Sequence, residues 1–151
     1  MPIFKYHIAL LFVVFSSYTF AIELKIATVS PDGSVWMTAL RDAAKQIAAG
    51  TENRVRLKFY PGGVMGDDYA VMRKIRIGQL HGGVMTIGPL VQATKEVQLY
   101  GLPMQFRSFE EVDYVRSQMD MRLVQAMRSS GYVSFGISEV GFAYAMSKER
   151  V

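Results

Sequence analysis

The chain lacks cysteine altogether and contains only two histidines in 151 residues. The missing thiols exclude disulfide bridges, thiolate metal sites and a cysteine nucleophile. His7 belongs to the N-terminal leader described below, and His81 stands alone before two glycines. A structural role for His81 is therefore favoured over a general base. The sequence shows no nucleophile motif, histidine pair or metal-ligand spacing, so it predicts no enzyme, no metal site and no cofactor.

A strong excess of charge is also missing, since the formal net charge is +4. Basic residues gather at residues 54–58 and 73–76. In the first group they alternate with Val55, Leu57 and Phe59, which places the charges on one face of a strand. No basic surface interleaved with aromatic residues is evident, and we expect no nucleic-acid partner. Half of the residues are apolar, which suffices for one packed domain and argues against disorder.

Residues 1–21 have the pattern of a secretory signal peptide. A short basic head is followed by an apolar run at residues 8–15, and the small residues Thr19 and Ala21 stand at the −3 and −1 positions of a cleavage site. The apolar run is too short for a membrane span, because polar serines interrupt it. An uncleaved N-terminal anchor is the alternative. We expect cleavage after Ala21 and export of the remaining chain, in which no later stretch is long enough to span a bilayer.

The rest of the chain alternates between strand and helix patterns. Residues 22–29 alternate in polarity and predict a strand. A helix follows, with Ser30 as N-cap, Pro31 in the first turn and Gly50 at its end. Its predicted apolar face consists of Trp36, Leu40, Ala44 and Ile47.

Further strands are expected at residues 54–60 and 80–86, with a helix at 67–77 between them. A helical turn after Pro89, a loop at 99–106, and one long or two short helices from Ser108 come next. Ser108 and Glu111 have the spacing of a capping box. One or two more strands are expected from Gly131 to residue 147. This order predicts an α/β layer fold with a mostly parallel sheet, which binds ligands beyond the carboxyl ends of its strands.

Three strand-to-helix turns are candidate binding elements. The turn at residues 28–36 would present free amide groups that favour an anion or a carbonyl oxygen, unless it is a plain capped turn. The turn at residues 59–68, with sequence FYPGGVMGDD, is glycine-rich but lacks the spacing of a dinucleotide or phosphate loop. Its two aspartates would begin a helix and repel phosphate, and a metal there would need further oxygen ligands. The third turn contains Thr86, Gly88 and Pro89, and a plain turn is again the alternative.

Glu139 is the acidic residue within the otherwise apolar run FGISEVGFAYAM. A charge there requires either a partner or a cleft, or it points to solvent from a sheet edge. Phe142 and Tyr144 lie two residues apart, on the same side of the predicted strand.

Four blocks of the sequence resemble the substrate-binding receptors of tripartite ATP-independent periplasmic (TRAP) transporters, the DctP-type family. They are LKIATVSPDGSVWMTALRDAAKQI, VRLKFYPGGVMGDDYAVMRKIRIGQLHGGVMTIG, LYGLPMQFRSFEEVDYVRSQMD and GFAYAMSKERV, and they occur in the family's order. The resemblance implies a periplasmic-binding-protein-like, Venus flytrap protein of two lobes. Such a receptor captures a small organic acid between its lobes and delivers it to TRAP membrane permease subunits.

The resemblance also implies which residues line the first-lobe side of the cleft. They come from the turns after three strands and from the segment around Glu139. They are Ser30, Pro31, Gly33, Ser34, Trp36, Met65, Thr86, Gly88, Pro89, Glu139, Phe142 and Tyr144. The glycines near Met65 are expected to shape a turn at the cleft rim.

The chain departs from the family's pattern in two respects. Members of the family are about twice as long, as two lobes of ordinary size require. Residues 22–151 are therefore expected to form the N-terminal lobe, ending near the crossover to a second lobe that is missing. The family's ligand-pairing arginine would lie beyond that point, and Ala143 stands where several relatives have another arginine.

We accordingly expect a truncated receptor that binds a carboxylate weakly or not at all, with an unpaired sheet edge and exposed apolar surface. The alternative reading is a periplasmic ligand-sensing domain on the same scaffold.

Overall fold

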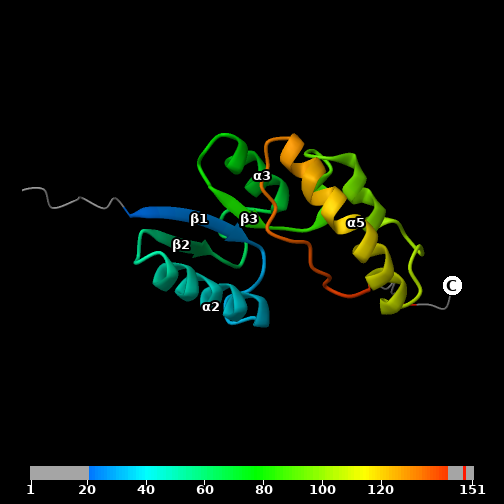
Figure 1. The fold of residues 1–151 in the computed structure, drawn as a ribbon, viewed down its shortest axis with the longest axis horizontal. Coiled ribbons are helices and arrows are strands. Elements are labelled where there is room, and N and C mark those ends of the chain that lie inside the picture. Colours follow the sequence, from blue (N-terminus) through cyan, green and yellow to red (C-terminus); the bar gives the residue numbers. More distant parts are fainter. Residues whose placement is uncertain (1–20, 143–147, 149–151) are drawn as a thin grey trace, which may run out of the picture. The chain divides into compact units, whose positions relative to one another are not determined.

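Alternating apolar residues near the N-terminus form the central strand of a small parallel sheet. In the computed structural model, which describes residues 21–142 and 148, β1 (Ile22–Thr28) pairs with β2 (Val55–Tyr60) on one side and β3 (Gly82–Val84) on the other. The strand order is β2-β1-β3 (Figure 1). Ile22 is level with Val55, and Thr28 is level with Val84. The predicted α/β fold with a parallel sheet is confirmed, although β3 is shorter than expected.

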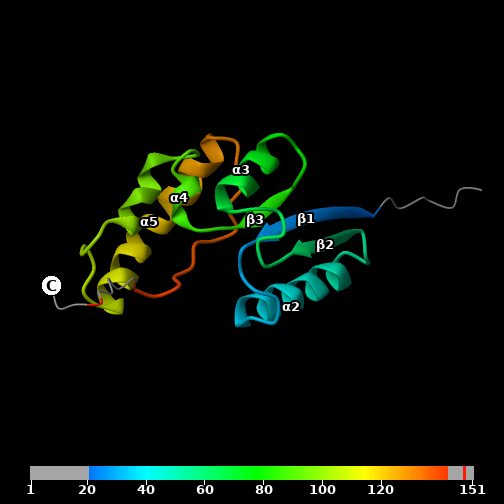
Figure 2. The same ribbon diagram turned by 180° about the vertical axis from the view of Figure 1, so that it is seen from behind.

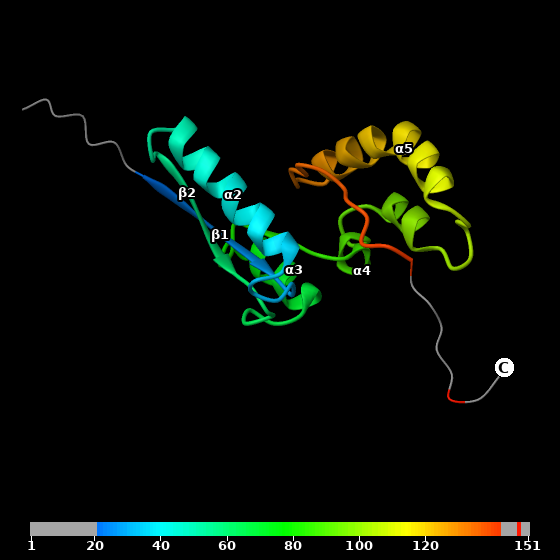
Figure 3. The same cartoon turned by 90° about the horizontal axis from the view of Figure 1, so that it is seen from below.

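The chain divides into two units at residues 84 and 85, and each is described separately. The first unit holds the sheet with helices α2 (Val35–Gly50) and α3 (Asp68–Arg76). These helices lie on opposite sides of the sheet (Figures 1 and 3). This arrangement follows from the strand order. The connection from β1 to β2 and the connection from β2 back past β1 to β3 run in opposite directions, and right-handed crossovers that run in opposite directions place their helices on opposite faces.

Helix α2 begins later than the sequence suggested. Ser34, rather than Ser30, is its N-cap, and the Ser34 side chain accepts a hydrogen bond from the amide of Met37. Ser30 is held in the preceding turn instead, where its amide donates to the hydroxyl of Thr28. Gly33, with a φ of +80°, separates that turn from the helix. The expected end of the helix at Gly50 is confirmed.

The buried face of α2 matches the predicted one in part, because Leu40 and Ala44 are partly buried as expected. Met37 is fully buried, whereas Trp36 and Ile47 remain 40% and 39% exposed at the edge of the interface. A period of 3.6 residues also fits a stripe of residues that contains Met37 in place of Trp36, so the pattern alone did not distinguish these two faces of the helix.

Helix α3 begins where the sequence indicated. The carboxylate of Asp67 accepts a hydrogen bond from the amide of Ala70 at 2.7 Å, and Asp68 occupies the first turn. Basic residues in the last turn complement the helix dipole. The helix packs against β1 and β3. The buried apolar residues of this unit are Ala27, Met37, Val71, Met72 and Leu80.

The second unit is helical in the part that the structure describes. It contains the short helix α4 (Ile87–Leu90), the 3-10 helix η1 (Lys95–Gly101) and the long helix α5 (Phe109–Ser129) (Figure 2). The loop expected at residues 99–106 therefore begins inside η1, and the region after Ser108 forms one helix rather than two. Three buried residues, Val97, Leu123 and Met127, form its core.

The strands expected from Gly131 onward are absent from the described residues. Residues 132–142 are irregular, and residues 143–147, which carry the rest of the predicted strand, lie outside the described part. Alternating polarity favours an extended chain, but a strand also needs a neighbour to pair with, and no described strand belongs to this unit. Within the described residues, no helix is both long and apolar enough to cross a membrane.

Candidate functional site

The turn between β1 and α2 is built from its own side chains. The buried hydroxyl of Thr28 accepts a hydrogen bond from the amide of Ser30 and donates one to its Oγ, both at 3.2 Å. The amide of Ser34 donates to the carbonyl of Pro31 at 3.2 Å. These bonds fix the course of the chain from the end of β1 to the start of α2.

Two amide groups at the start of α2 are left available. The Ser34 side chain caps the amide of Met37, but no acceptor among the described residues bonds the N–H groups of Val35 and Trp36. Such groups at a helix N-terminus carry partial positive charge and favour an anionic oxygen. The turn is capped, as the plain-turn alternative expects, and it also leaves these two amides free, so anion binding here stays a prediction.

The same turn carries an ion pair. Arg41 Nη2 lies 2.7 Å from Asp32 Oδ1, and both side chains are largely exposed. The hydrogen bond and charge of the Arg41 guanidinium lower the pKa of the Asp32 carboxyl. The ionised Asp32 carboxylate is therefore paired with the Arg41 guanidinium within this turn.

The glycine-rich turn after β2 uses its amides internally. The N–H of Gly62 donates to the carbonyl of Ser30 at 2.8 Å, and that of Gly63 donates to the carbonyl of Thr28 at 3.1 Å. The N–H of Gly66 donates to Gly63 at 2.8 Å. Groups engaged in this way are not available to cradle a phosphate, as the sequence had indicated. The turn instead clamps the chain that follows β1, a contact that the sequence did not predict.

Met65, the candidate residue in this turn, is half-buried, and its carbonyl accepts a hydrogen bond from Lys74 Nζ at 2.8 Å. Gly66 has a φ of +94°, and a Cβ atom there would lie 2.8 Å from the Cβ of Ala70. The turn is consequently held against α3 as well as against the turn after β1.

The sheet topology indicates where a ligand would bind. The chain winds from β1 outward to β2 and then returns past β1 to β3, so the winding direction reverses between β1 and β3. Open parallel sheets bind ligands outside the carboxyl ends of the strands at such a reversal. Here that point lies beside Thr28 and Val84, which are register partners.

The second unit contains the other described candidates. Thr86 is the N-cap residue of α4, Gly88 is exposed and Pro89 is buried. Pro89 therefore supports the turn from inside. A hollow of about 430 Å³ lies at α4, and it is lined by Ile87, Gly88, Val91, Gln98, Gly101 and Leu102.

The segment near the end of the described chain gives a mixed result. Glu139 is exposed, which matches the solvent-facing alternative. Phe142 packs on Phe109, with ring centroids 5.0 Å apart. Tyr144 lies outside the described residues, so its predicted placement on the same side as Phe142 stays a prediction.

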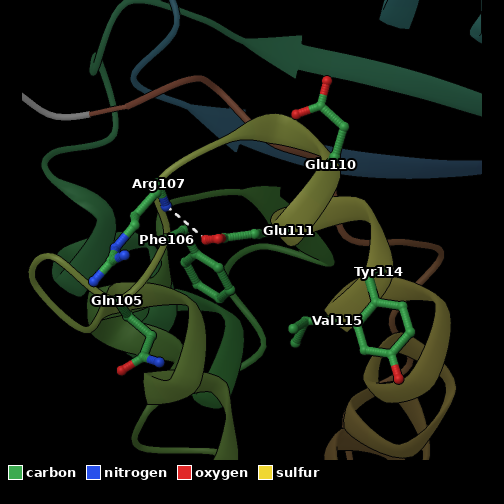
Figure 4. Close-up of a pocket in the computed structure, with 7 residues that line it drawn as sticks. All are labelled: Gln105, Phe106, Arg107, Glu110, Glu111, Tyr114 and Val115. Carbon is green, nitrogen blue, oxygen red and sulfur yellow. Dashed lines mark hydrogen bonds between the residues drawn. The ribbon is translucent and has the colours of Figure 1, made fainter.

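A hollow that the sequence did not predict lies at the start of α5 (Figure 4). Its volume is about 550 Å³. Glu111 Oε2 accepts a hydrogen bond from the amide of Arg107 at 2.8 Å, while the amide of Glu111 donates to Ser108 Oγ at 3.3 Å. The bond from the Glu111 amide to Ser108 is that of a capping box, but the Glu111 carboxylate accepts from the amide of Arg107 and not from that of the N-cap residue Ser108. The lining residues are Gln105, Phe106, Arg107, Glu110, Glu111, Tyr114 and Val115.

His81 has the structural role that the sequence favoured. Its Nδ1 accepts a hydrogen bond from the amide of Lys25 at 3.0 Å, and its own amide donates to the Lys25 carbonyl at 2.9 Å. These bonds extend the pairing of β1 and β3. Among residues 21–142 and 148, no group of three acidic or histidine side chains could hold a metal ion.

The strand order and the flanking helices define an α/β fold of the kind that binds ligands at the ends of its strands, and comparisons with known proteins identify its family. The sequence profile of the bacterial extracellular solute-binding proteins, family 7 (DctP), matches residues 26–150. The chain belongs to this family, whose members are solute receptors. No significant match was found among curated protein sequences.

Solved structures of TRAP periplasmic solute-binding proteins share the fold. The protein from Ochrobactrum anthropi, whose C-terminus is bound in the ligand-binding pocket, is 25% identical, with a TM-score of 0.71 over 82% of this chain and 39% of that one. The protein from Sulfitobacter sp. NAS-14.1, with bound β-D-galacturonate, is 20% identical, with a TM-score of 0.67 over 76% and 39% of the two chains.

The sugar acid binding protein of Advenella mimigardefordensis, in complex with galactonate, is 16% identical, with a TM-score of 0.67 over 78% and 38%. This chain thus spans about 39% of the length of the first two structures.

Proposed function

We propose that this chain provides the N-terminal lobe of a TRAP-type receptor, which captures a small organic acid outside the cytoplasm for delivery to membrane permease subunits. The observation that carries the proposal is the family match over residues 26–150. The strand order supports it, because its reversal point is where sheets of this kind bind ligands. Export follows from the expected signal peptide at residues 1–21, and the periplasm is then the site of capture.

The ligand class proposed is a sugar acid or a related hydroxy acid. Relatives with the same fold were solved with galacturonate, galactonate, glucuronate and erythronate, all of which carry one carboxylate beside several hydroxyl groups. The described part of this chain has matching groups in the turn after β1. The free amides of Val35 and Trp36 suit the carboxylate, and the hydroxyl groups of Ser30 and Ser34 suit the ligand's hydroxyls.

The proposed first-lobe contacts are the residues expected from the sequence. In the first unit they are Ser30, Pro31, Gly33, Ser34, Trp36 and Met65. In the second they are Thr86, Gly88, Pro89, Glu139 and Phe142, with Tyr144 beyond the described residues. None of these side chains carries a positive charge, so a carboxylate would be held by neutral donors alone.

Weak binding by this chain alone follows from that donor set. A hydrogen bond to a charged group contributes about 1.5–3 kcal/mol, so two amides contribute about 3–6 kcal/mol. The freedom lost on association offsets much of this, which leaves a dissociation constant on the order of millimolar or weaker. A bidentate arginine would add both strength and orientation.

Amide chemical shifts measured during titration with galacturonate test the proposal. Galactose is the matched control, because it replaces the carboxylate with a neutral hydroxymethyl group. We expect galacturonate to shift the amide signals of Val35 and Trp36 at millimolar concentrations, and galactose to leave them in place. Equal shifts with both sugars, or no shift with either, would contradict carboxylate capture by this turn. Micromolar binding would contradict the proposed weakness of the lobe.

A further inference from the structure

The segment after α5 has a defined course despite its lack of regular structure. Residues 132–142 run back along α5 (Figures 1 and 3). Tyr132 and Ile137 pack against the core of the second unit, and the ring of Phe142 contacts Phe109. Because no strand ladder secures this segment, its position depends on a small number of side-chain contacts.

Arg116 on α5 makes one of these contacts, to the backbone of the segment. Its Nη2 donates to the carbonyl of Ile137 at 2.8 Å, while its Nε donates to Asp120 Oδ2 at 3.1 Å. One planar guanidinium therefore spans the helix and the segment. Lysine could not reproduce this fork, because its donors sit on a single nitrogen.

Asp120 is itself held in place from η1. The hydroxyl of Tyr100 donates to Asp120 Oδ1 at 2.5 Å, so both carboxylate oxygens are engaged. Burial and the neighbouring carboxylate raise the pKa of the Tyr100 hydroxyl, which keeps it protonated as a donor. The side chains of Arg116 and Asp120 are only 27% and 29% exposed, so the fork is sheltered from competing water.

We propose that Arg116 is a positioning residue, which the Tyr100–Asp120 pair aims at the Ile137 carbonyl so that residues 137–142 stay against α5. This segment carries Glu139 and Phe142, two of the proposed ligand contacts. The functional meaning of the inference therefore rests on the proposed receptor function. The mechanical part does not, because it concerns only the mobility of the segment.

Site-directed spin labelling measures that mobility without any ligand. The chain has no cysteine, so Ser138→Cys introduces one attachment point for a nitroxide, at an exposed residue beside Ile137. A second labelled protein, with Gln46→Cys on the exposed side of α2, reports on the other unit. Both are made in the full 151-residue chain, and each is combined with Arg116→Met, Arg116→Lys or Arg122→Met. Arg122 is the matched control, because it lies exposed on the same helix.

We expect Arg116→Met to abolish the immobilised component of the spectrum at position 138 and to leave position 46 unchanged. Arg116→Lys should narrow the spectrum at position 138, because a single nitrogen cannot bond both Asp120 and the Ile137 carbonyl. It retains the pairing with Asp120, so the circular dichroism melting curve should stay close to that of the parent. Arg122→Met should change neither label.

If the Arg116→Met variant fails to fold, the spectrum of the Arg116→Lys variant at position 138 alone tests the proposal. Spectra at position 138 that match the parent in every folded Arg116 variant would overturn the proposal, as would equal narrowing in Arg122→Met. A failed sugar-acid titration would affect the proposed function but not this result.

Discussion

Replacing Val35 with proline removes one of the two free amides at the start of α2 and little else. Val35 is the first residue of the helix, where proline is well tolerated because the missing N–H has no partner inside the helix. Ser34 already has the extended conformation that a following proline requires, with φ −64° and ψ 159°. The Val35 side chain is 85% exposed, so its loss removes little packing.

The substitution should weaken ligand binding without lowering the stability of the helix. Loss of one hydrogen bond to a carboxylate, worth about 1.5–3 kcal/mol, should weaken galacturonate binding roughly 10- to 100-fold. The helix should be unchanged or slightly more stable, by about 0.4–1 kcal/mol, because proline restricts the unfolded chain. The Trp36 amide shift during titration and thermal melting by circular dichroism provide the two measurements.

Val35→Ala is the control, because it trims the same side chain but keeps the amide. It should bind as the parent does. If the proline and alanine variants give the same titration curve, the amide does not contact the acid, and the assignment of this turn to carboxylate binding is refuted. A large loss of helicity in the proline variant would instead refute the placement of the helix start.

Three further predictions concern the first unit. His81→Ala should lower the free energy of unfolding by about 1 kcal/mol, measured by urea denaturation, because its Nδ1 accepts a hydrogen bond from a β1 amide. Gly66→Ala should cost roughly 2 kcal/mol or more, because the added Cβ would meet the Cβ of Ala70 at 2.8 Å and φ is +94°. The Asp32–Arg41 pair lowers the folded-state pKa of the carboxyl, so its stabilisation is present above the unfolded-state pKa and lost as pH falls through the folded-state value. Melting temperatures recorded below about pH 5 should therefore fall less steeply in Arg41→Met than in the parent.

Each of these has a control or a contrary outcome. Gly78→Ala also places alanine at a positive φ, +74°, but in open space, so it should cost less than Gly66→Ala. Equal costs would show that the contact with Ala70 does not matter. A His81 variant as stable as the parent would mean that water replaces the imidazole acceptor. Parallel pH profiles for the parent and Arg41→Met would show that the ion pair contributes nothing in solution.

The sequence predicted the elements whose signals are local. The strand β1 and the start of α3 were identified because polarity alternates in the one and an aspartate caps the other. The start of α2 was placed too early, since Ser30 and Ser34 are both good caps and only the tertiary bonds of the turn distinguish them. The strands expected after Gly131 were wrong within the described residues, because alternating polarity does not reveal whether a partner strand exists.

In the candidate site, the turns could be predicted from the sequence, but the bonds between them could not. Glycines after a strand indicated a turn, but the bonds that join it to Ser30 and Thr28 link segments that are distant in sequence. The guanidinium fork of Arg116 was likewise invisible, since its acceptor lies 21 residues away in an irregular segment. Such contacts leave no periodicity in the sequence.

The position of β1 in the sheet has a consequence for the order of folding. β1 is the first element in the chain but the middle strand of the sheet, and the bond between Lys25 and His81 joins residues 56 positions apart. Closing a loop of that length costs about 3.5 kcal/mol in chain entropy before the strands gain anything from pairing. The sheet therefore cannot be completed until Val84 has been synthesised, and the N-terminal strand stays unpaired on its β3 side until then. For the export that we propose, such a delay would keep a new chain in the unfolded state that a secretion channel accepts.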